Sequence, residues 1–323
     1  MSNIFVTRKI PDVGIKMLKE KGYEVDVRDE DSMPTARELF RALKKKPYDA
    51  VLSSWPEPIG AEVFEAFPSV KIFANFTIGY DNIDLVEAKK HGVVVTNAPA
   101  TTASEAVAEH AFALMISLAT NIVEAHEFVR RGKYKGWSAM NFMGPDLLGN
   151  TLGIIGAGRI GERLAHYASA FGMKIIYTDV ARNERIEKDC NAVYVATPDE
   201  LLPQADFVSI HAPLLSSTRH LIDERRLKLM KKTAYLVNTA RGPIVDEAAL
   251  VSALKDRTIA GAGLDVFENE PKLAPGLAKL DNVILTPHIA SASDSARNEM
   301  SRLAAQNIID FLEGKAPKNI VNP

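Results

Sequence analysis

The stretch Thr151-Leu152-Gly153-Ile154-Ile155-Gly156-Ala157-Gly158-Arg159-Ile160-Gly161 decides the fold of this chain. Its first five residues form an apolar run typical of a buried strand, and the glycines that follow have the spacing Gly-x-Gly-x-x-Gly. A helical pattern then runs to Phe171, and a second strand-like run, Lys174 to Thr178, ends at Asp179. Strand, turn, helix and strand, closed by an acidic residue, are typical of a dinucleotide-binding unit.

The three glycines have separate physical roles in such a unit. Gly156 permits a tight turn, Gly158 lets the backbone approach a pyrophosphate, and Gly161 lets the helix pack closely on the strand. The N–H groups and the dipole of the helix N-terminus favour phosphates. A purely structural glycine turn is the alternative, but the strand, the helix and Asp179 together favour a dinucleotide.

Asp179 favours NAD over NADP. A carboxylate at the end of the second strand accepts hydrogen bonds from the ribose hydroxyls and repels a 2′-phosphate. Arg182 and Arg185 follow this strand and could reach such a phosphate, so NADP is the less favoured alternative.

Composition and charge describe an ordinary globular chain. It has 323 residues, of which 46% are hydrophobic and 25% charged, so its length predicts two domains. A formal net charge of -2 provides no basic face, and neither nucleic acid nor an anionic membrane is an expected partner. A strand-like run at Asn3 to Thr7, with no leader peptide before it, predicts a cytoplasmic protein.

The first hundred residues alternate between strand-like and helix-like runs. Such alternation predicts a parallel sheet with right-handed crossovers, in outline a flavodoxin-like domain. The predicted strands are Ile4 to Thr7, Glu24 to Val27, Ala50 to Ser53, Lys71 to Ala74 and Val93 to Asn97, with helices between them at Pro11 to Lys21, Thr35 to Lys46, Ala61 to Ala66 and Asp84 to His91.

One long helix is predicted between the two sheets, from Ser104 as its N-cap to about Arg130. The last helix, Ser291 to about Leu312, is expected to return to the first domain. The predicted domains are therefore residues 1–99 plus 290–323, and residues 100–289, which include the interdomain helix and a dimerisation loop.

That loop, predicted at residues 132–150, has an irregular sequence rich in glycine and large apolar residues. Trp137, Met140, Phe142 and Met143 would be costly to expose. We expect them to cover either their own domain or a second subunit.

Three further strand ends carry polar residues suited to chemistry. Arg241 follows a predicted strand that ends at Asn238, and Glu270 lies in the turn after the next strand. His288 follows the strand after that. Because the carboxyl ends of parallel strands share one edge of a sheet, these three side chains are expected to converge. Glu268 lies in the same turn and is the alternative partner for the histidine.

The chain resembles the D-2-hydroxyacid dehydrogenase family over essentially its whole length, and within it the glyoxylate and hydroxypyruvate reductases. The matching stretches, in the family's order, are Gly79-Tyr80-Asp81-Asn82-Ile83-Asp84, Gly153 to Gly161, Asn238-Thr239-Ala240-Arg241-Gly242, Gly263-Leu264-Asp265-Val266-Phe267-Glu268 and Thr286-Pro287-His288-Ile289-Ala290. The resemblance implies two doubly wound parallel-sheet α/β domains, a Rossmann-type NAD-binding domain and a flavodoxin-like substrate domain, with a cleft between them. It also implies a homodimer.

The resemblance implies reduction of a 2-oxo acid by hydride transfer from NADH. Arg241 would hold the substrate carboxylate and polarise the carbonyl, for which its planar fork is suited. His288 would act as general acid and base. Glu270 would bind the far imidazole nitrogen and orient the ring.

No metal is expected, because the acidic residues near the cleft lack any ligand spacing and an arginine can take the place of a Lewis acid. The resemblance also implies the residues that contact the two ligands. Those for the cofactor are Gly156, Gly158, Arg159, Ile160, Gly161, Asp179, His211, Pro213, Thr239, Ala240, Asp265 and Ala290, with Asp265 orienting the nicotinamide carboxamide. Those for the substrate are Arg241, His288, Trp55 and the backbone N–H groups of Ile78 and Gly79.

Departures from relatives narrow the substrate. Ile78 stands where phosphite dehydrogenases have lysine, and Glu270 stands where formate dehydrogenases have glutamine. Ser53-Ser54-Trp55 lacks the basic residue usual in phosphoglycerate dehydrogenases. A small 2-oxo acid with an uncharged tail, glyoxylate or hydroxypyruvate, is therefore expected. A D-3-phosphoglycerate dehydrogenase, or an NAD(H)-sensing scaffold without activity like the family's corepressors, is the alternative.

Overall fold

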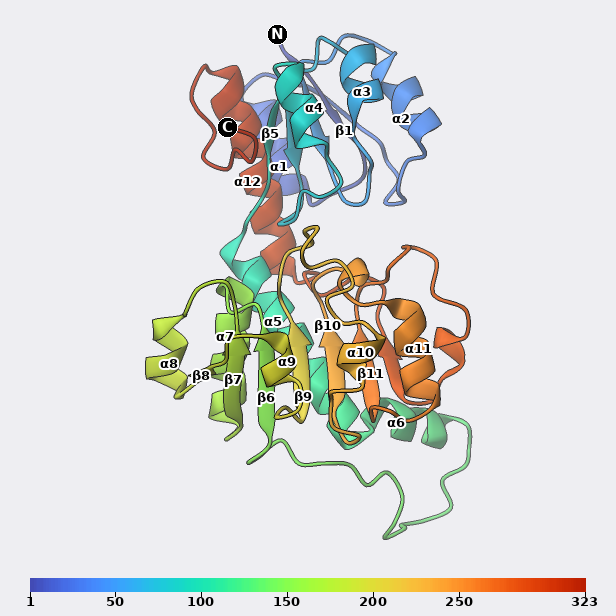
Figure 1. Cartoon of the computed structure of the whole chain (residues 1–323). Coiled ribbons are helices and arrows are strands. Elements are labelled where there is room, and N and C mark those ends of the chain that lie inside the picture. Colours follow the sequence, from blue (N-terminus) through green and yellow to red (C-terminus); the bar gives the residue numbers. More distant parts are fainter. The chain divides into compact units, whose positions relative to one another are not determined.

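The computed structural model describes residues 1–323 and divides into two compact units. Unit 1 consists of residues 1–103 and 292–323, and unit 2 of residues 104–291. Each unit contains one parallel sheet with helices packed on it (Figure 1). The predicted fold class, α/β with two doubly wound parallel sheets, is confirmed.

The sheet of unit 1 has the strand order β2-β1-β3-β4-β5, which is the flavodoxin-like order, and all neighbours are parallel. Its strands are β1 (Asn3–Val6), β2 (Glu24–Val27), β3 (Ala50–Ser53), β4 (Ile72–Asn75) and β5 (Val94–Thr96). Its helices are α1 (Asp12–Glu20), α2 (Ala36–Leu43), α3 (Ala61–Ala66), α4 (Leu85–Lys90) and α12 (Asp294–Leu312).

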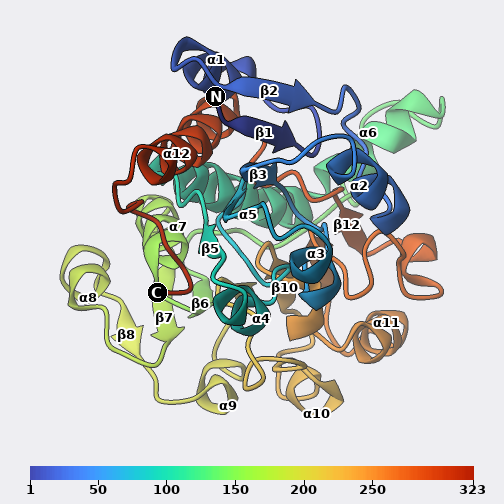
Figure 2. The same cartoon turned by 90° about the horizontal axis from the view of Figure 1, so that it is seen from above.

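The last helix, α12, packs beside α1 in unit 1 (Figures 1 and 2). The two helices approach closely at Gly14, whose N–H donates to Ser301 Oγ at 3.1 Å. A Cβ on this glycine would lie 2.3 Å from the Ser301 carbonyl oxygen, so a side chain there would force the helices apart. On the opposite layer, alternate strand residues such as Phe5, Val51 and Phe73 are buried in one core with α2 and α3.

The sheet of unit 2 has seven parallel strands in the order β12-β11-β10-β9-β6-β7-β8. Its strands are β6 (Thr151–Ile155), β7 (Lys174–Thr178), β8 (Val193–Tyr194), β9 (Phe207–Ile210), β10 (Tyr235–Asn238), β11 (Gly261–Leu264) and β12 (Val283–Leu285). The order reverses between β6 and β9, and ligands of such sheets bind at the carboxyl ends around this switch point.

Unit 2 has seven α-helices. They are α5 (Thr101–Thr120), which begins in unit 1, α6 (Ile122–Arg130), α7 (Arg159–Ala170), α8 (Glu184–Cys190), α9 (Pro198–Leu201), α10 (Glu224–Leu227) and α11 (Glu247–Lys255), with 3-10 turns at Gly242–Ile244 and Leu277–Lys279. Helix α5 packs closely on β11 because the strand has small residues there. A Cβ on Gly263 would lie 3.1 Å from Leu114 Cβ of α5.

The prediction of a single helix from Ser104 to Arg130 is wrong in two respects. The helix begins at Thr101, so Ser104 lies inside it and is not its N-cap. It also breaks at Asn121, whose φ of 51° is left-handed, and α5 and α6 are bent by 63°. Asparagine tolerates this conformation, and its Nδ2 donates to Phe142 O at 3.2 Å. No single helix is long and apolar enough to cross a membrane, although this bent pair passes by length and composition.

Residues 131–150 form the predicted irregular segment and extend away from the sheet of unit 2 (Figure 1). Trp137 is 86% exposed, Met140 75% and Met143 69%. The alternative that these three side chains cover their own domain is therefore wrong. Phe142 is only partly exposed, because its ring packs edge-on against Phe128 at 5.3 Å between centroids.

Candidate functional site

The carboxyl edge of the unit 2 sheet carries the predicted catalytic residues on three neighbouring strands. Arg241 follows β10, Glu270 lies in the turn after β11, and His288 follows β12. Figure 1 shows the ends of β10 and β11 side by side at this edge. Residues almost fifty positions apart in sequence are thus brought together by parallel pairing.

His288 and Glu270 form a hydrogen-bonded pair. His288 Nδ1 lies 2.9 Å from Glu270 Oε2, and the side chains are 32% and 17% exposed. The other carboxylate oxygen, Oε1, accepts the Phe267 N–H at 3.0 Å, which fixes the carboxylate in its turn. Since an ionised carboxylate only accepts, Nδ1 carries the proton and Nε2 is the nitrogen suited to proton exchange with a substrate.

Glu268, the alternative partner, points elsewhere. Its Oε1 lies 2.7 Å from Nε2 of His220, a residue for which the sequence showed no functional context. The turn therefore holds two separate His–Glu pairs, and the one at the strand edge is that of Glu270.

Arg241 is held by the turn after β10. Asn238 Nδ2 donates to the Arg241 carbonyl at 2.9 Å, and the Arg241 Nη1 donates to the Ala240 carbonyl at 2.8 Å. The following residue, Gly242, lies against the turn that carries Glu270, because a Cβ there would be 1.9 Å from the Phe267 carbonyl carbon. Glycine at this position lets the Arg241 turn and the Glu270 turn touch.

Asp265 fixes the segment that carries His288. The residue is fully buried, and its carboxylate accepts the Thr286 hydroxyl at 2.6 Å and the N–H groups of Ile289 and Ala290 at 2.9 and 2.8 Å. His288 has a left-handed φ of 55°, and its N–H donates to the Asp265 carbonyl at 2.9 Å. The predicted contact of Asp265 and Ala290 with the cofactor stays a prediction.

The glycine loop after β6 has the shape that a dinucleotide needs. Cβ atoms on Gly156 and Gly161 would lie 2.6 Å from Ala212 N and 2.2 Å from Gly156 O, so the protein itself excludes side chains there. A Cβ on Gly158 would have no atom of the chain within 4 Å. Gly158 caps α7, whose first turn contains Arg159 and Ile160, so the helix N–H groups face this space.

Two buried polar atoms at the carboxyl ends of β9 and β10, on the same edge of the sheet as this loop, have no hydrogen-bond partner within the protein. They are His211 Nδ1, after β9, and Thr239 Oγ1, after β10. His211 Nε2 lies 2.8 Å from Ser209 Oγ, and burial lowers the pKa of this histidine to about 3, so it is neutral. Buried polar groups are normally bonded, and these two fit a polar ligand along the strand ends. Pro213 and Ala240 lie in the same two loops.

Asp179 ends β7 next to the glycine loop. Its Oδ2 accepts the Ala157 N–H at 2.7 Å and its Oδ1 accepts the Val180 N–H at 2.6 Å. The carboxylate is thereby tied to the loop that would hold the pyrophosphate. The two arginines beyond it pair with carboxylates of unit 2, Arg182 with Glu187 at 2.9 Å and Arg185 with Glu162 at 2.8 Å.

In unit 1 the predicted N–H pair lies on the loop after β4, in the run 76–79. The Thr77 carbonyl accepts the Ala98 N–H at 2.8 Å, and the Ile78 carbonyl accepts Asn97 Nδ2 at 2.7 Å. A trans peptide points its N–H opposite to its C=O. The N–H groups of Ile78 and Gly79 therefore point away from these partners, and none of the described bonds uses them. Trp55, after β3, is half-buried, and its role stays a prediction.

Sequence reasoning missed one residue at this edge. His110, on α5, lies with its Nε2 3.0 Å from Thr286 Oγ1 and 3.5 Å from Asp265 Oδ1. No local pattern marks it, because its partners are more than 150 residues away in sequence. No group of three or more His, Cys, Asp or Glu residues is arranged to hold a metal.

Comparison with known proteins is consistent with this geometry. Residues 112–290 match the model of the D-isomer specific 2-hydroxyacid dehydrogenase NAD-binding domain. The chain is 47% identical to a glyoxylate reductase of Korarchaeum cryptofilum, over 99% of this chain and 95% of that one.

Two solved structures superimpose on nearly the whole chain. An NADPH-dependent glyoxylate/hydroxypyruvate reductase of Sinorhizobium meliloti is 32% identical, with a TM-score of 0.86 over 100% of this chain and 99% of that one. A D-lactate dehydrogenase of Aquifex aeolicus, complexed with NAD and lactic acid, is 32% identical, with a TM-score of 0.85 over 100% and 99%. The resemblance inferred from the motifs is confirmed, and the chain belongs to the D-isomer specific 2-hydroxyacid dehydrogenase family.

Proposed function

We propose that the protein is an NADH-dependent reductase of a small 2-oxo acid, with glyoxylate or hydroxypyruvate as substrate. The observation that carries this proposal is the His288–Glu270 pair at 2.9 Å beside Arg241, on the strand edge that also carries the glycine loop. A hydride acceptor that becomes an alkoxide needs a proton donor and a cation, and these residues supply both.

Each residue has a defined part in this proposal. Arg241 binds the carboxylate of the 2-oxo acid and draws electron density from its carbonyl oxygen. His288 gives its Nε2 proton to that oxygen, and Glu270 compensates the positive charge of the ring before the proton leaves. The dinucleotide, when bound, supplies the hydride. Gly158, the α7 N-terminus, Asp179, His211 and Thr239 are the residues that would hold it.

We further propose that NADH is preferred to NADPH. Asp179 places negative charge beside the glycine loop, where a 2′-phosphate would be repelled. Arg182 and Arg185, the first two cations after Asp179 in the sequence, both pair with carboxylates of unit 2, so neither is placed to offset that repulsion. Comparison of kcat/KM with NADH and NADPH tests this preference, and a higher value with NADPH would contradict it.

The direct test of the reaction is loss of NADH absorbance with glyoxylate, hydroxypyruvate, pyruvate and bulkier 2-oxo acids. Discrimination by pocket size is worth only about 1–3 kcal/mol per methylene, so several small acids should react, the smallest fastest. If none of the panel oxidises NADH, the proposed function is wrong.

The structure offers a matched control for the role of His288. His220 pairs with Glu268 at 2.7 Å in the same unit and is similarly exposed, at 39%. We expect His288→Asn to lower kcat by roughly 100- to 10,000-fold with NADH affinity kept. His220→Asn should keep kcat within about twofold of the wild type. Equal losses in the two variants would contradict a chemical role for His288.

We also propose that the chain forms a homodimer through the segment 131–150. Trp137, Met140 and Met143 are largely exposed and so are not covered by their own unit. Exposed apolar side chains that lie close together on one projecting segment are typical of an interface. Light scattering should show a dimer, and Trp137→Ser with Met143→Ser should shift it toward monomer. A monomeric wild type would refute the proposal. The cytoplasmic location and the exclusion of nucleic acid and membrane stay predictions.

A further inference from the structure

Unit 1 contains a buried ion pair that the proposed chemistry does not use directly. Glu57, four residues after the end of β3, has a side chain only 1% exposed, and Arg8, two residues after β1, is 14% exposed. The Arg8 Nε and Nη2 donate to the same carboxylate oxygen, Glu57 Oε1, at 3.0 and 2.9 Å. Burial raises the pKa of the Glu57 carboxyl, although Arg8 acts in the opposite direction.

Stability alone does not explain such a pair. The desolvation of two charges consumes most of their attraction, and apolar residues of similar volume are often as stabilising. We therefore expect an ion pair buried at the carboxyl ends of strands to fix the position of a neighbouring loop.

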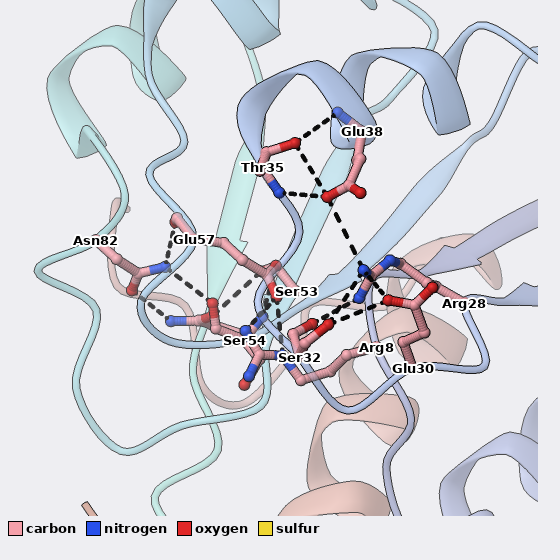
Figure 3. Close-up of polar contacts among 11 residues, drawn as sticks. Arg8, Arg28, Glu30, Ser32, Thr35, Glu38, Ser53, Ser54, Glu57 and Asn82 are labelled. Atoms are coloured by element: carbon pink, nitrogen blue, oxygen red, sulfur yellow. Dashed lines mark hydrogen bonds and ion pairs between the residues drawn. The ribbon is translucent and has the colours of Figure 1, made fainter. Parts of the chain in front are cut away.

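The segment that the pair fixes is the loop carrying Ile78 and Gly79. The other Glu57 carboxylate oxygen accepts the Ser54 N–H at 3.1 Å, and the Glu57 carbonyl accepts Asn82 Nδ2 at 2.9 Å (Figure 3). Asn75 Nδ2 in turn donates to Asn82 Oδ1 at 2.9 Å and to Thr77 Oγ1 at 2.8 Å, and the Thr77 hydroxyl donates to the Gly79 carbonyl. A series of contacts thus leads from Arg8 through the Glu57 residue and the side chains of Asn82, Asn75 and Thr77 to the carbonyl of Gly79.

We infer that Arg8 and Glu57 are positioning residues that hold the Ile78 and Gly79 N–H groups where they bind the substrate carboxylate, an inference that rests on the proposed function. Neither side chain contacts the substrate in this scheme. The pair acts on the loop from two sides. The Glu57 carboxylate holds Ser54, next to Ser53, whose carbonyl accepts the Phe76 N–H at the start of the loop at 2.7 Å, and the Glu57 carbonyl holds Asn82. An N–H pair displaced by about 1 Å binds a carboxylate much less well.

The test uses two conservative variants and a matched control. Arg8→Lys removes the fork that reaches Glu57, and Glu57→Gln removes the charge while keeping the shape. Arg28→Lys is the control, because Arg28 pairs with Glu30 in the same unit, as Figure 3 also shows, and lies outside the series of bonds to Gly79. We expect Arg8→Lys and Glu57→Gln to raise KM for the 2-oxo acid about tenfold, with KM for NADH and kcat within about threefold. The control should match the wild type.

A second measurement separates this inference from the proposed function. Amide exchange in peptides spanning residues 76–84 of the ligand-free protein should be faster in Arg8→Lys than in Arg28→Lys. Unchanged KM for the 2-oxo acid together with unchanged exchange would overturn the inference. A wild type that turns over no 2-oxo acid would overturn the proposed function, while the exchange still reports whether the pair holds the loop. If the buried variants do not fold, Asn82→Ser breaks the same series outside the buried charge and must show the same rise in KM.

Discussion

Replacement of Gly158 by alanine tests whether this glycine is required for dinucleotide binding rather than for folding. Gly158 has an extended backbone, with φ of -71°, and an added Cβ would meet no atom of the chain within 4 Å. Loss of the glycine N-cap should lower the free energy of unfolding by a few tenths of a kcal/mol to about 1 kcal/mol. Alanine also reduces the conformational entropy of the unfolded chain, which should raise the free energy of unfolding by about 0.4–1 kcal/mol. We therefore expect the free energy of unfolding to change by less than about 0.5 kcal/mol.

The expected effect on dinucleotide binding is much larger. The new methyl group would occupy the space through which the loop approaches the pyrophosphate. Overpacking of a closely fitted site costs about 1–3 kcal/mol, which corresponds to a rise of roughly 5- to 150-fold in Kd for NADH. Titration of NADH fluorescence measures Kd without any turnover, and thermal unfolding measures stability on the same sample.

Two other glycines provide the controls. Gly60 caps α3 in unit 1 with an extended backbone and open space, so Gly60→Ala reproduces the capping change and should leave Kd for NADH unaltered. Gly161→Ala should instead destabilise the protein, since its Cβ would lie 2.2 Å from Gly156 O. The reasoning fails if Gly158→Ala binds NADH as tightly as the wild type, or if it melts as early as Gly161→Ala.

Three further predictions concern the site and its surroundings. Gly242→Ala should displace the Glu270 turn, because its Cβ would be 1.9 Å from Phe267, and should lower kcat by roughly 100-fold, which steady-state kinetics would show. Burial lowers the pKa of His211 to about 3 in the folded protein, whereas in the unfolded chain this histidine takes up a proton below about pH 6.5. The free energy of unfolding should therefore fall as the pH decreases below about 6.5, and His211→Gln should remove up to about 1.4 kcal/mol of this loss per pH unit. Equal pH slopes for the variant and the wild type in thermal unfolding would contradict this reasoning. His110→Ala should loosen the Thr286 contact and lower kcat more than NADH affinity, whereas unchanged kinetics would make His110 a packing residue.

The sequence was sufficient to predict the two sheets and to place the proposed catalytic residues at neighbouring strand ends. The alternation of short apolar runs with helical runs determines parallel pairing, and parallel pairing alone brings Arg241 and His288 to one edge. The acidic turn was harder, because Glu268 and Glu270 are two residues apart and either could reach a histidine. Only the folded turn assigns each carboxylate to its own partner.

Features decided by tertiary contacts could not be predicted. The apolar pattern continues through Asn121, so nothing in the local sequence distinguishes one helix from two. The hydrogen bond from the Asn121 side chain to Phe142 joins residues 21 positions apart, and a periodic pattern does not predict it. Arg8 and Glu57 were overlooked because a pair 49 residues apart looks like two surface charges until burial is known. Short elements such as α9 and β8 have too few residues for any periodicity.

The left-handed backbone of His288 sets stability against activity at one position. A residue other than glycine held at positive φ costs on the order of 1–3 kcal/mol, which the bonds of Asp265 to the same segment offset. Glycine, or to a lesser degree asparagine, would relieve that cost at this position and, under the proposed mechanism, abolish proton transfer. A laboratory selection of this protein for heat resistance alone would therefore tend to lose the histidine, whereas one that also requires turnover would retain it.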